Sequence, residues 1–377
     1  MRSTNIFLAF TLTALSMLSP APTLAGSAPQ SPREGAVSRQ RRDDNAIKRI
    51  DRFSLTLTVD LETALANIRA SGKGQIEPTS RVYVPCPAED EFQDVLSVKV
   101  QVDGSPVNLM EVKEAGGRKL YAIHVDSLTS QSLAVTYDMV RYQVDKSDKV
   151  KYTNRNLRPP SDEEFKFYTR DLGLGADKED FKNLVASVGL QRNANEGEYA
   201  YVSRLCRYFT ARLNYRAEYF PVSNAVEFIT KLRPEVDCIY SAQLIHSFLC
   251  AAQIPCRVNS VVGIDESNQI RFHRVNYFWD SQRGWLPVDL SFFVASQRQD
   301  IVDYLGRDST FILLDYPRSA VDMGVDVLYR VMIPELKRSV TYPLASGQNL
   351  FLLYSSGQVT FLVPKGSHTP LLVKSRD

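Results

Sequence analysis

The sequence predicts an α+β fold, in which an N-terminal antiparallel β-sandwich precedes a core of helices followed by strands and a β-rich C-terminal extension. Apolar and polar residues alternate between residues 49 and 145, which is the period of half-buried strands. Beyond Pro159 and Pro160 the period lengthens to that of helices, and it returns to strands after residue 257. Strands and helices grouped in this way are typical of α+β chains and not of alternating α/β chains.

The first 25 residues have the layout of a cleaved secretory signal. Arg2 precedes an apolar run from Ile6 to Leu18, and small residues follow near Ala25. A membrane span needs about 20 apolar residues, so this shorter run is more typical of export. A buried N-terminal helix is the alternative interpretation. We therefore expect an exported, periplasmic or secreted protein with no stable membrane span after signal removal, in which residues 26–46 form a flexible linker.

The composition restricts the partners and cofactors of the protein. The 377 residues include 45 Lys and Arg against 43 Asp and Glu, a net charge of +2. Such a chain lacks the basic surface typical of nucleic-acid binding, and we expect no nucleic-acid partner. We also expect no metal and no cofactor, because Cys and His are not clustered at zinc-ligand spacing. The oligomeric state is left open.

Residues 47–150 are expected to form the β-sandwich domain. Apolar residues at 53, 55, 57 and 59 alternate with polar ones, as do those at 98–102 and 133–137. Turn signals separate the strands at Gly72-Lys73-Gly74, Asp103-Gly104 and Gly116-Gly117. Short antiparallel strands at this spacing predict a sandwich of immunoglobulin-like size.

Residues 151–300 are expected to form the mixed core, and residues 301–377 a β-rich C-terminal segment. Helical periodicity covers residues 199–209, 225–232 and 238–252. Strand patterns follow at residues 257–262, 270–279 and 285–292, and in the C-terminal segment at 310–314, 350–354 and 358–363.

Cys238 has the local setting of a reactive thiol. Asp237 is a good helix N-cap, which makes Cys238 the first helical residue. The positive end of the helix dipole favours thiolate over thiol. A core cysteine would show the same pattern, because Cys238 shares an apolar stripe with Ala242, Ile245 and Leu249.

The remaining cysteines and His246 are interpreted as structural residues or as partners in a disulfide. The chain has 5 cysteines, and this odd number leaves at least one thiol outside any intrachain disulfide. Cys250 and Cys256 could pair across the end of the helix or remain as buried free thiols, and Cys206 is most simply a core residue. His246 is expected to be a polar residue on the same helix as Cys238.

A hairpin brings an imidazole and a carboxylate together. Residues 280–284 are a polar segment with a terminal Gly, suited to a hairpin loop. Pairing Trp279 with Trp285 places His273 and Asp289 on one face as diagonal neighbours, and a slip of two residues places them directly opposite. An odd register would place them on opposite faces. In either even register His273 could take the proton from Cys238 while Asp289 orients the imidazole, and the backbone N–H of Cys238 could stabilise an oxyanion.

Around these residues the sequence resembles the transglutaminase-like superfamily, from about residue 196 to residue 292. The motifs that carry the resemblance are Asp237-Cys238-Ile239-Tyr240-Ser241-Ala242, Ile254-Pro255-Cys256-Arg257-Val258, His273 and Gly284-Trp285-Leu286-Pro287-Val288-Asp289. The resemblance implies a papain-like core with Cys238 as the nucleophile, His273 as the base and Asp289 as the orienting acid. Residues 82–87 are similar to the sandwich that precedes this core in exported bacterial members.

Some positions depart from the pattern of the family. Val236 and Gln253 stand where the family has glycine, and Arg274-Val275 stands where it has Ala-Trp. Tyr215 lies where members often carry an aromatic residue, which either lines the cleft or packs in the core. Peptide N-glycanases of this superfamily carry paired CxxC motifs that this chain lacks.

We therefore expect an exported thiol-dependent amide-bond enzyme that acts through Cys238, His273 and Asp289 on protein or peptide substrates. The resemblance covers cysteine proteases, amidases and transglutaminase-type acyltransferases. Hydrolysis is favoured over cross-linking, because water is always available and no amine-binding site is legible. The alternative is a catalytically degenerate member that serves as a binding or scaffold module of the cell envelope.

Overall fold

The computed structural model describes the chain from Ala46 to Ser375, with gaps. The chain divides into two compact units, residues 1–34 and 35–377, and every described residue belongs to the second. The described residues are 46–62, 66, 81–85, 87, 91–113, 119–124, 132–147, 157–171, 175–216, 235–264, 270–298, 300–307, 312–313, 328–333, 338–343, 351–355, 358–362 and 365–375. The signal, nearly all of the linker, the helix expected at 225–232 and the turns at 72–74 and 116–117 lie outside them.

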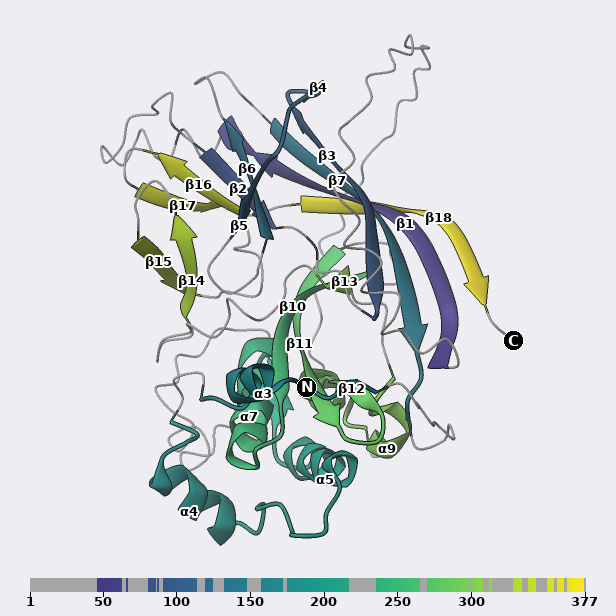
Figure 1. Cartoon of the computed structure of the whole chain (residues 1–377), viewed down its shortest axis with the longest axis vertical. Helices are drawn as coiled ribbons and strands as arrows, with labels where there is room; N and C mark the ends of the chain where they lie inside the picture. Colours follow the sequence, from purple (N-terminus) through teal and green to yellow (C-terminus); the bar gives the residue numbers. More distant parts are fainter. Residues whose placement is uncertain are drawn as a thin grey trace, which may run out of the picture. The chain divides into compact units, whose positions relative to one another are not determined.

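Two antiparallel five-stranded sheets are built from strands at both ends of the sequence (Figure 1). The first has the order β18-β1-β7-β3-β4, with bounds Lys365–Ser375, Ile47–Asp60, Ser132–Val144, Gln93–Val102 and Ser105–Pro106. The second has the order β17-β16-β2-β6-β5, with bounds Gln358–Leu362, Phe351–Ser355, Arg81–Pro85, Lys119–His124 and Met110–Lys113.

The alternation in the N-terminal sequence places one set of side chains in a shared core. Leu55, Leu57 and Val135 of the first sheet are fully buried in the same hydrophobic cluster as Val82 and Val84 of the second. Successive side chains of a strand point to opposite faces, so the apolar residues at every second position of these strands contribute to this cluster. The turn predicted at Asp103-Gly104 is confirmed, since these residues join β3 to β4.

The C-terminal strands join the same two sheets as the N-terminal strands. β18 pairs with β1 along ten positions, from Arg49↔Ser375 to Thr58↔Lys365, and β16 pairs with β2. A separate two-stranded sheet contains β14 (Leu328–Ile333) and β15 (Arg338–Pro343). The sequence predicted strands in this segment but gave no sign of their long-range pairing.

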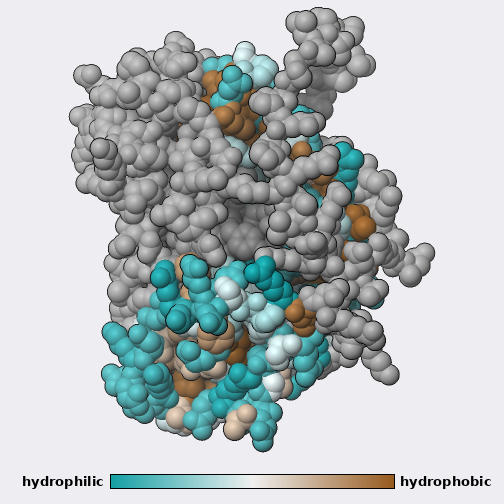
Figure 2. Space-filling model, viewed as in Figure 1, coloured by the Kyte–Doolittle hydropathy of each residue, from teal (hydrophilic) through white to brown (hydrophobic). Residues whose placement is uncertain are grey.

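The middle of the chain forms a mixed helix and strand core. Its helices are α3 (Asp162–Tyr168), α4 (Glu179–Ser187), α5 (Glu198–Thr210), α7 (Cys238–Ala251), α8 (Leu290–Ser296) and α9 (Ile301–Tyr304). A four-stranded antiparallel sheet has the order β12-β11-β10-β13, with bounds Gly284–Val288, Ile270–Asp280, Cys256–Ile264 and Ile312–Leu313. On the face drawn in Figure 2, the described part of the helical region is mostly hydrophilic, with hydrophobic residues between.

Helix α7 lies in the centre of this core. All residues from Cys238 to Cys250 are buried, so the helix is covered on every side and not only along the expected stripe. A helix that is buried on all sides is typical of the interior of a larger domain. α4, α5, α8 and the sheet supply the surrounding cluster.

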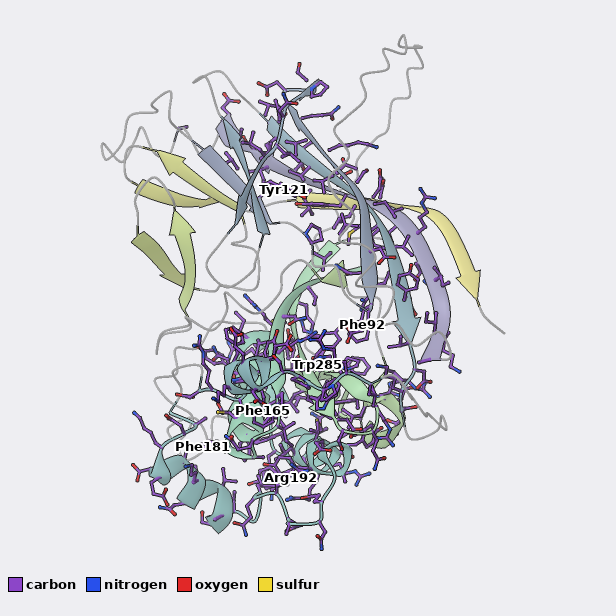
Figure 3. The ribbon with its side chains drawn as sticks, viewed as in Figure 1. Phe92, Tyr121, Phe165, Phe181, Arg192 and Trp285 are labelled. Carbon is purple, nitrogen blue, oxygen red and sulfur yellow. The ribbon has the colours of Figure 1, made fainter. Side chains whose placement is uncertain are left out.

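The β11–β12 hairpin has the register in which Trp279 pairs with Trp285, as predicted. Asp280 pairs with Gly284, whose φ of +79° favours glycine at the end of the turn. The two indole rings meet edge to face, with their centroids 5.6 Å apart. Trp285 shares a second cluster with Phe92, and both are labelled in Figure 3.

The strand expected over residues 285–292 is wrong beyond Val288. The side chain of Asp289 accepts a hydrogen bond from the backbone N–H of Phe292 and caps helix α8. The backbone of this N-cap residue is still extended, and its side chain satisfies an otherwise unpaired donor at the start of the helix. The chain therefore turns into α8 directly after the hairpin.

Candidate active site

Cys238 is the first residue of α7, as the sequence predicts. The carboxylate of Asp237 accepts a hydrogen bond of 2.8 Å from the backbone N–H of Tyr240. The unpaired N–H groups at this helix end give it a partial positive charge, which favours an anionic sulfur. Burial raises the pKa of the Asp237 carboxyl to about 6, against the backbone hydrogen bonds that favour its charged form.

His273 and Asp289 meet at the end of the hairpin. The Nε2 atom of His273 lies 2.7 Å from Oδ2 of Asp289. The hairpin ends at the pair Asn276↔Val288, so Asp289 directly follows the last paired residue of β12, and His273 lies three residues before Asn276 on β11. His273 also has a side-chain hydrogen bond with Cys238. The three predicted site residues therefore come together from the start of α7, the strand β11 and the cap of α8.

The charges of this group stabilise one another. Burial disfavours the imidazolium of His273, but the Asp289 carboxylate and the contact with Cys238 outweigh it and raise the pKa of His273 to about 10. Burial likewise opposes ionisation of Asp289, but His273, Ser291 and the N–H of Phe292 hold the pKa of its carboxyl below the usual value. Both residues are consequently charged at neutral pH.

Ser291 belongs to the same group, and the sequence did not reveal it. Its Oγ donates a hydrogen bond of 2.5 Å to Oδ1 of Asp289 and lies 3.3 Å from Nε2 of His273. Its signal in the sequence is its place two residues after Asp289, which is informative only once Asp289 is known to begin a helix.

Two exposed aromatic side chains lie beside this group. Tyr215 of β8 (Asn214–Tyr215) pairs with Val236 of β9 (Glu235–Val236), two residues before Cys238. Its side chain is 37% exposed. Burial, followed by the charges of Cys238, Asp237 and Asp289, raises the pKa of its hydroxyl to about 12. Phe292 is 42% exposed on α8, which contacts β8.

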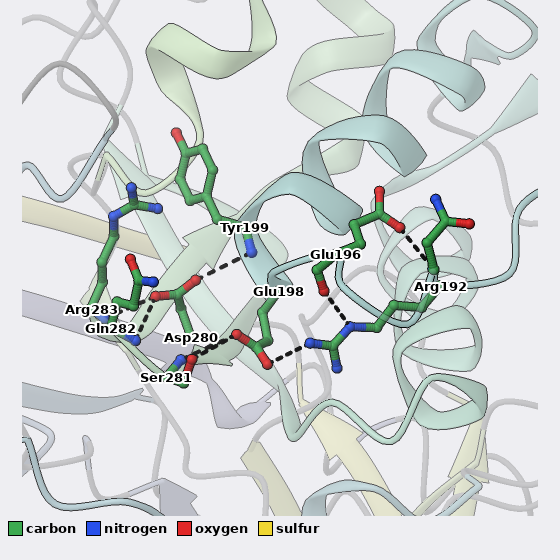
Figure 4. A network of polar contacts seen from close by, with 9 residues as sticks. Arg192, Glu196, Glu198, Tyr199, Asp280, Ser281, Gln282 and Arg283 are labelled. Carbon is green, nitrogen blue, oxygen red and sulfur yellow. Dashed lines mark hydrogen bonds and ion pairs between the residues drawn. The ribbon is translucent and has the colours of Figure 1, made fainter.

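A polar network ties the hairpin turn to the start of α5 (Figure 4). Asp280 accepts hydrogen bonds from the backbone N–H of Tyr199 at 3.2 Å and from those of Gln282 and Arg283 within the turn. Glu198 accepts a hydrogen bond from Ser281 and forms an ion pair of 2.7 Å with Arg192. The turn that sets the register is therefore held by hydrogen bonds within itself and by hydrogen bonds to the start of α5.

None of the four cysteines within the described ranges forms a disulfide. Cys206, Cys238, Cys250 and Cys256 are all buried free thiols, so the alternative pairing of Cys250 with Cys256 is wrong. Cys86 lies outside the described residues. Cys250 donates a hydrogen bond to the backbone oxygen of Thr169 at 2.7 Å.

His246 is a buried core residue. Its Nε2 atom lies 3.1 Å from the backbone oxygen of Arg170, and its side chain is remote from solvent. Burial lowers the pKa of His246 to about 4, although the carbonyl of Arg170 and the charge of Asp171 favour protonation. The imidazole is therefore neutral and fixes the segment after α3 to α7.

We expect this buried histidine to make the protein less stable in mild acid. The unfolded chain protonates His246 near pH 6.5 and the folded chain only near pH 4, so unfolding takes up a proton between these values. The free energy of unfolding should fall by about 2–3 kcal/mol between pH 6.5 and pH 4.5 from this residue alone.

The matched variant is His246→Gln, whose amide can donate to the same carbonyl without titrating. Urea unfolding of both proteins at several pH values measures the effect. A stability difference between them that stays constant with pH would contradict it. His273 contributes in the opposite direction: its stabilisation is complete below pH 6.5 and is lost as the pH rises through about 10.

Within the described ranges, no group of three or more His, Cys, Asp and Glu side chains is arranged to hold a metal ion. Among the described helices, none is both long and apolar enough to span a membrane.

Residues 182–290 match the family model described as transglutaminase-like superfamily, which confirms the resemblance seen in the motifs. No curated protein matches the chain. Among solved structures, the chain is similar to a candidate cysteine protease from Cytophaga hutchinsonii, with 14% identity and a TM-score of 0.49 over 87% of this chain and 92% of that one. It is also similar to the periplasmic domain of TgpA from Pseudomonas aeruginosa bound to ethylmercury, with 17% identity and a TM-score of 0.35 over 70% of this chain and 96% of that one.

Proposed function

Because residues 182–290 match the transglutaminase-like superfamily, we propose that the protein is a thiol-dependent amide-bond enzyme. Cys238 is the nucleophile, His273 the acid and base, and Asp289 the group that orients and charges the imidazole. The observation that carries the proposal is His273 itself, which is hydrogen-bonded to Asp289 at 2.7 Å and contacts Cys238 at the positive end of a buried helix.

The reaction follows from these contacts. Nε2 of His273 faces Asp289, so Nδ1 is the nitrogen that exchanges a proton with the Cys238 sulfur. The thiolate attacks the amide carbonyl, and the backbone N–H of Cys238 stabilises the oxyanion. The imidazolium then gives its proton to the leaving amine as the C–N bond breaks, which leaves a thioester on Cys238.

The second half of the reaction releases the acyl group. Neutral His273 takes a proton from water, and the hydroxide that forms attacks the thioester carbonyl. The carbon–sulfur bond breaks to give a carboxylic acid and the Cys238 thiolate, and His273 is again protonated. An amine in place of water would give transamidation by the same steps. We favour water, which needs no further binding site.

We propose a protein or peptide as the substrate, in the periplasm or outside the cell. The exposed rings of Tyr215 and Phe292 offer apolar surface beside the reacting atoms, which suits the side chains of a peptide better than a small polar amide. Export rests on the pattern in residues 1–25.

Trapping of the acyl-enzyme tests the proposal. An electrophilic peptide probe, such as a peptidyl acyloxymethyl ketone, should label the purified protein once, at Cys238, as located by peptide mass. The label should be absent from Cys238→Ser and should persist in Cys206→Ser, whose thiol is also buried. If Cys238 reacts no faster than a free thiol model compound, the enzyme reading fails, and a binding module of the cell envelope becomes the better interpretation.

A further inference from the structure

We propose that Ser291 is a positioning residue that holds the imidazole of His273 in the orientation and protonation state that Cys238 requires. The inference rests on the proposed function, because it concerns the same reacting group. It adds a fourth residue, outside the Cys, His and Asp set.

The hydroxyl of Ser291 has one proton, and its geometry fixes where that proton goes. The Oγ atom lies 2.5 Å from Oδ1 of Asp289, which can only accept a hydrogen bond when charged. The proton of the hydroxyl is therefore used there. Towards Nε2 of His273, at 3.3 Å, the Oγ atom can only act as an acceptor.

Nε2 of His273 consequently faces two acceptors, Oδ2 of Asp289 and Oγ of Ser291. A ring nitrogen between two acceptors keeps its proton in both the charged and the neutral imidazole. Nδ1 is then the nitrogen that gains and loses a proton. Ser291 thus favours the tautomer in which the lone pair of the neutral ring is on the side of Cys238.

Ser291 also helps to keep Asp289 charged inside the protein. Oδ1 of Asp289 accepts hydrogen bonds from the Ser291 hydroxyl and from the N–H of Phe292 at 3.0 Å. The Ser291 residue is 2% exposed, so water cannot simply replace the hydroxyl in the folded protein. Loss of the hydroxyl would leave the buried carboxylate with one donor fewer. It would also remove the acceptor beside Nε2 of His273, and an acceptor at this nitrogen favours the imidazolium.

The test compares Ser291→Ala with Ser296→Ala on the same helix. The Oγ atom of Ser296 is exposed and donates a hydrogen bond of 2.6 Å to the backbone oxygen of Phe292. Ser291→Ala should lower the pKa of His273 measured by NMR by about one unit. It should therefore lower the rate of amide turnover at pH 10 by about fivefold, because fewer imidazoles are protonated there. The chain has 4 histidines, and the His273 resonance is assigned by its absence in His273→Ala.

Ser296→Ala should match the wild type in both measurements, and Ser291→Thr, which restores a hydroxyl, should recover most of the rate. Thermal unfolding identifies any variant that fails to fold. If Ser291→Ala does not fold, Ser291→Thr is compared with Ser291→Val, which has the same shape but no hydroxyl. An unchanged pKa of His273 and an unchanged rate in the variants without the hydroxyl would overturn the inference. A failure of the proposed function gives a different result. In that case Cys238 would be alkylated as fast in His273→Ala as in the wild type.

Discussion

His273→Ala should lower the alkylation rate of Cys238 by about 10- to 10³-fold at pH 5.5, with a smaller loss at pH 8. In the wild type the pKa of His273 is raised to about 10, so an imidazolium stands beside the sulfur at both pH values and stabilises its thiolate. Only the thiolate is alkylated, and removal of that charge takes away one of the groups that favour it.

The pH dependence separates this effect from a general loss of structure. Between pH 5.5 and pH 8 the rate in His273→Ala should rise with pH more steeply than the wild-type rate. Turnover of an amide substrate should fall by about 10² to 10⁴-fold in the variant, because the leaving amine then lacks its acid. Above pH 10 the wild type should lose activity as well, since His273 becomes neutral there.

The matched control is His368→Ala, on β18 of another sheet, which should leave the alkylation profile unchanged. Second-order rates measured by mass spectrometry of the Cys238 peptide give the comparison. If His273→Ala reacts at pH 5.5 as fast as the wild type, the imidazole has no part in ionising the thiol.

Much of the site could be predicted from short-range signals. Asp237 and the periodicity after it place Cys238 at a helix start, and the cap is present with a hydrogen bond of 2.8 Å to Tyr240. The polar turn ending in Gly284 gives an even register, and Asp280 fixes that turn with two hydrogen bonds to Gln282 and Arg283. These features are local, and local chemistry is legible in a single sequence.

The sequence contains a signal for the start of α8, the N-cap residue Asp289, but the strand pattern of its neighbours obscures it. The residues after Asp289 are Leu290, Ser291 and Phe292, and apolar and aromatic residues on every side of a cap suit a strand as well as a helix. Asp289 has two tasks, since one oxygen binds His273 and the other caps the helix. The apolar residues after Asp289 favour a strand, whereas the cap of Asp289 begins a helix.

Long-range pairing could not be predicted. Nothing in residues 365–375 indicates that they lie beside residues 49–58, because a strand pattern shows which face is buried but not which strand is its neighbour. Gln253 is a smaller case. Its φ is +55°, the left-handed conformation that favours glycine after a helix, which gives a physical reason for the glycine that the family has at this position.

The largest effect on stability is expected for Phe248→Ala. Phe248 is fully buried on α7, and its ring meets Phe181 of α4 and Phe209 of α5 edge to face, with centroid distances of 5.3 Å and 5.2 Å. Removal of a buried phenylalanine ring loses its transfer free energy and leaves a cavity among rigid neighbours, at a cost of about 3–5 kcal/mol. The matched control Phe165→Ala, on a side chain that is 38% exposed, should change stability by less than about 0.5 kcal/mol.

Urea unfolding measures both variants, and it also separates the stability of the core from the chemistry of the site. Phe248 lies ten residues after Cys238 on α7, about 15 Å along the helix axis. The ring is therefore remote from the sulfur. Folded Phe248→Ala should keep the alkylation rate of Cys238 and its pH profile, while unfolding at a much lower urea concentration. A loss of less than about 1 kcal/mol would mean that α4 and α5 do not hold α7 through this aromatic cluster.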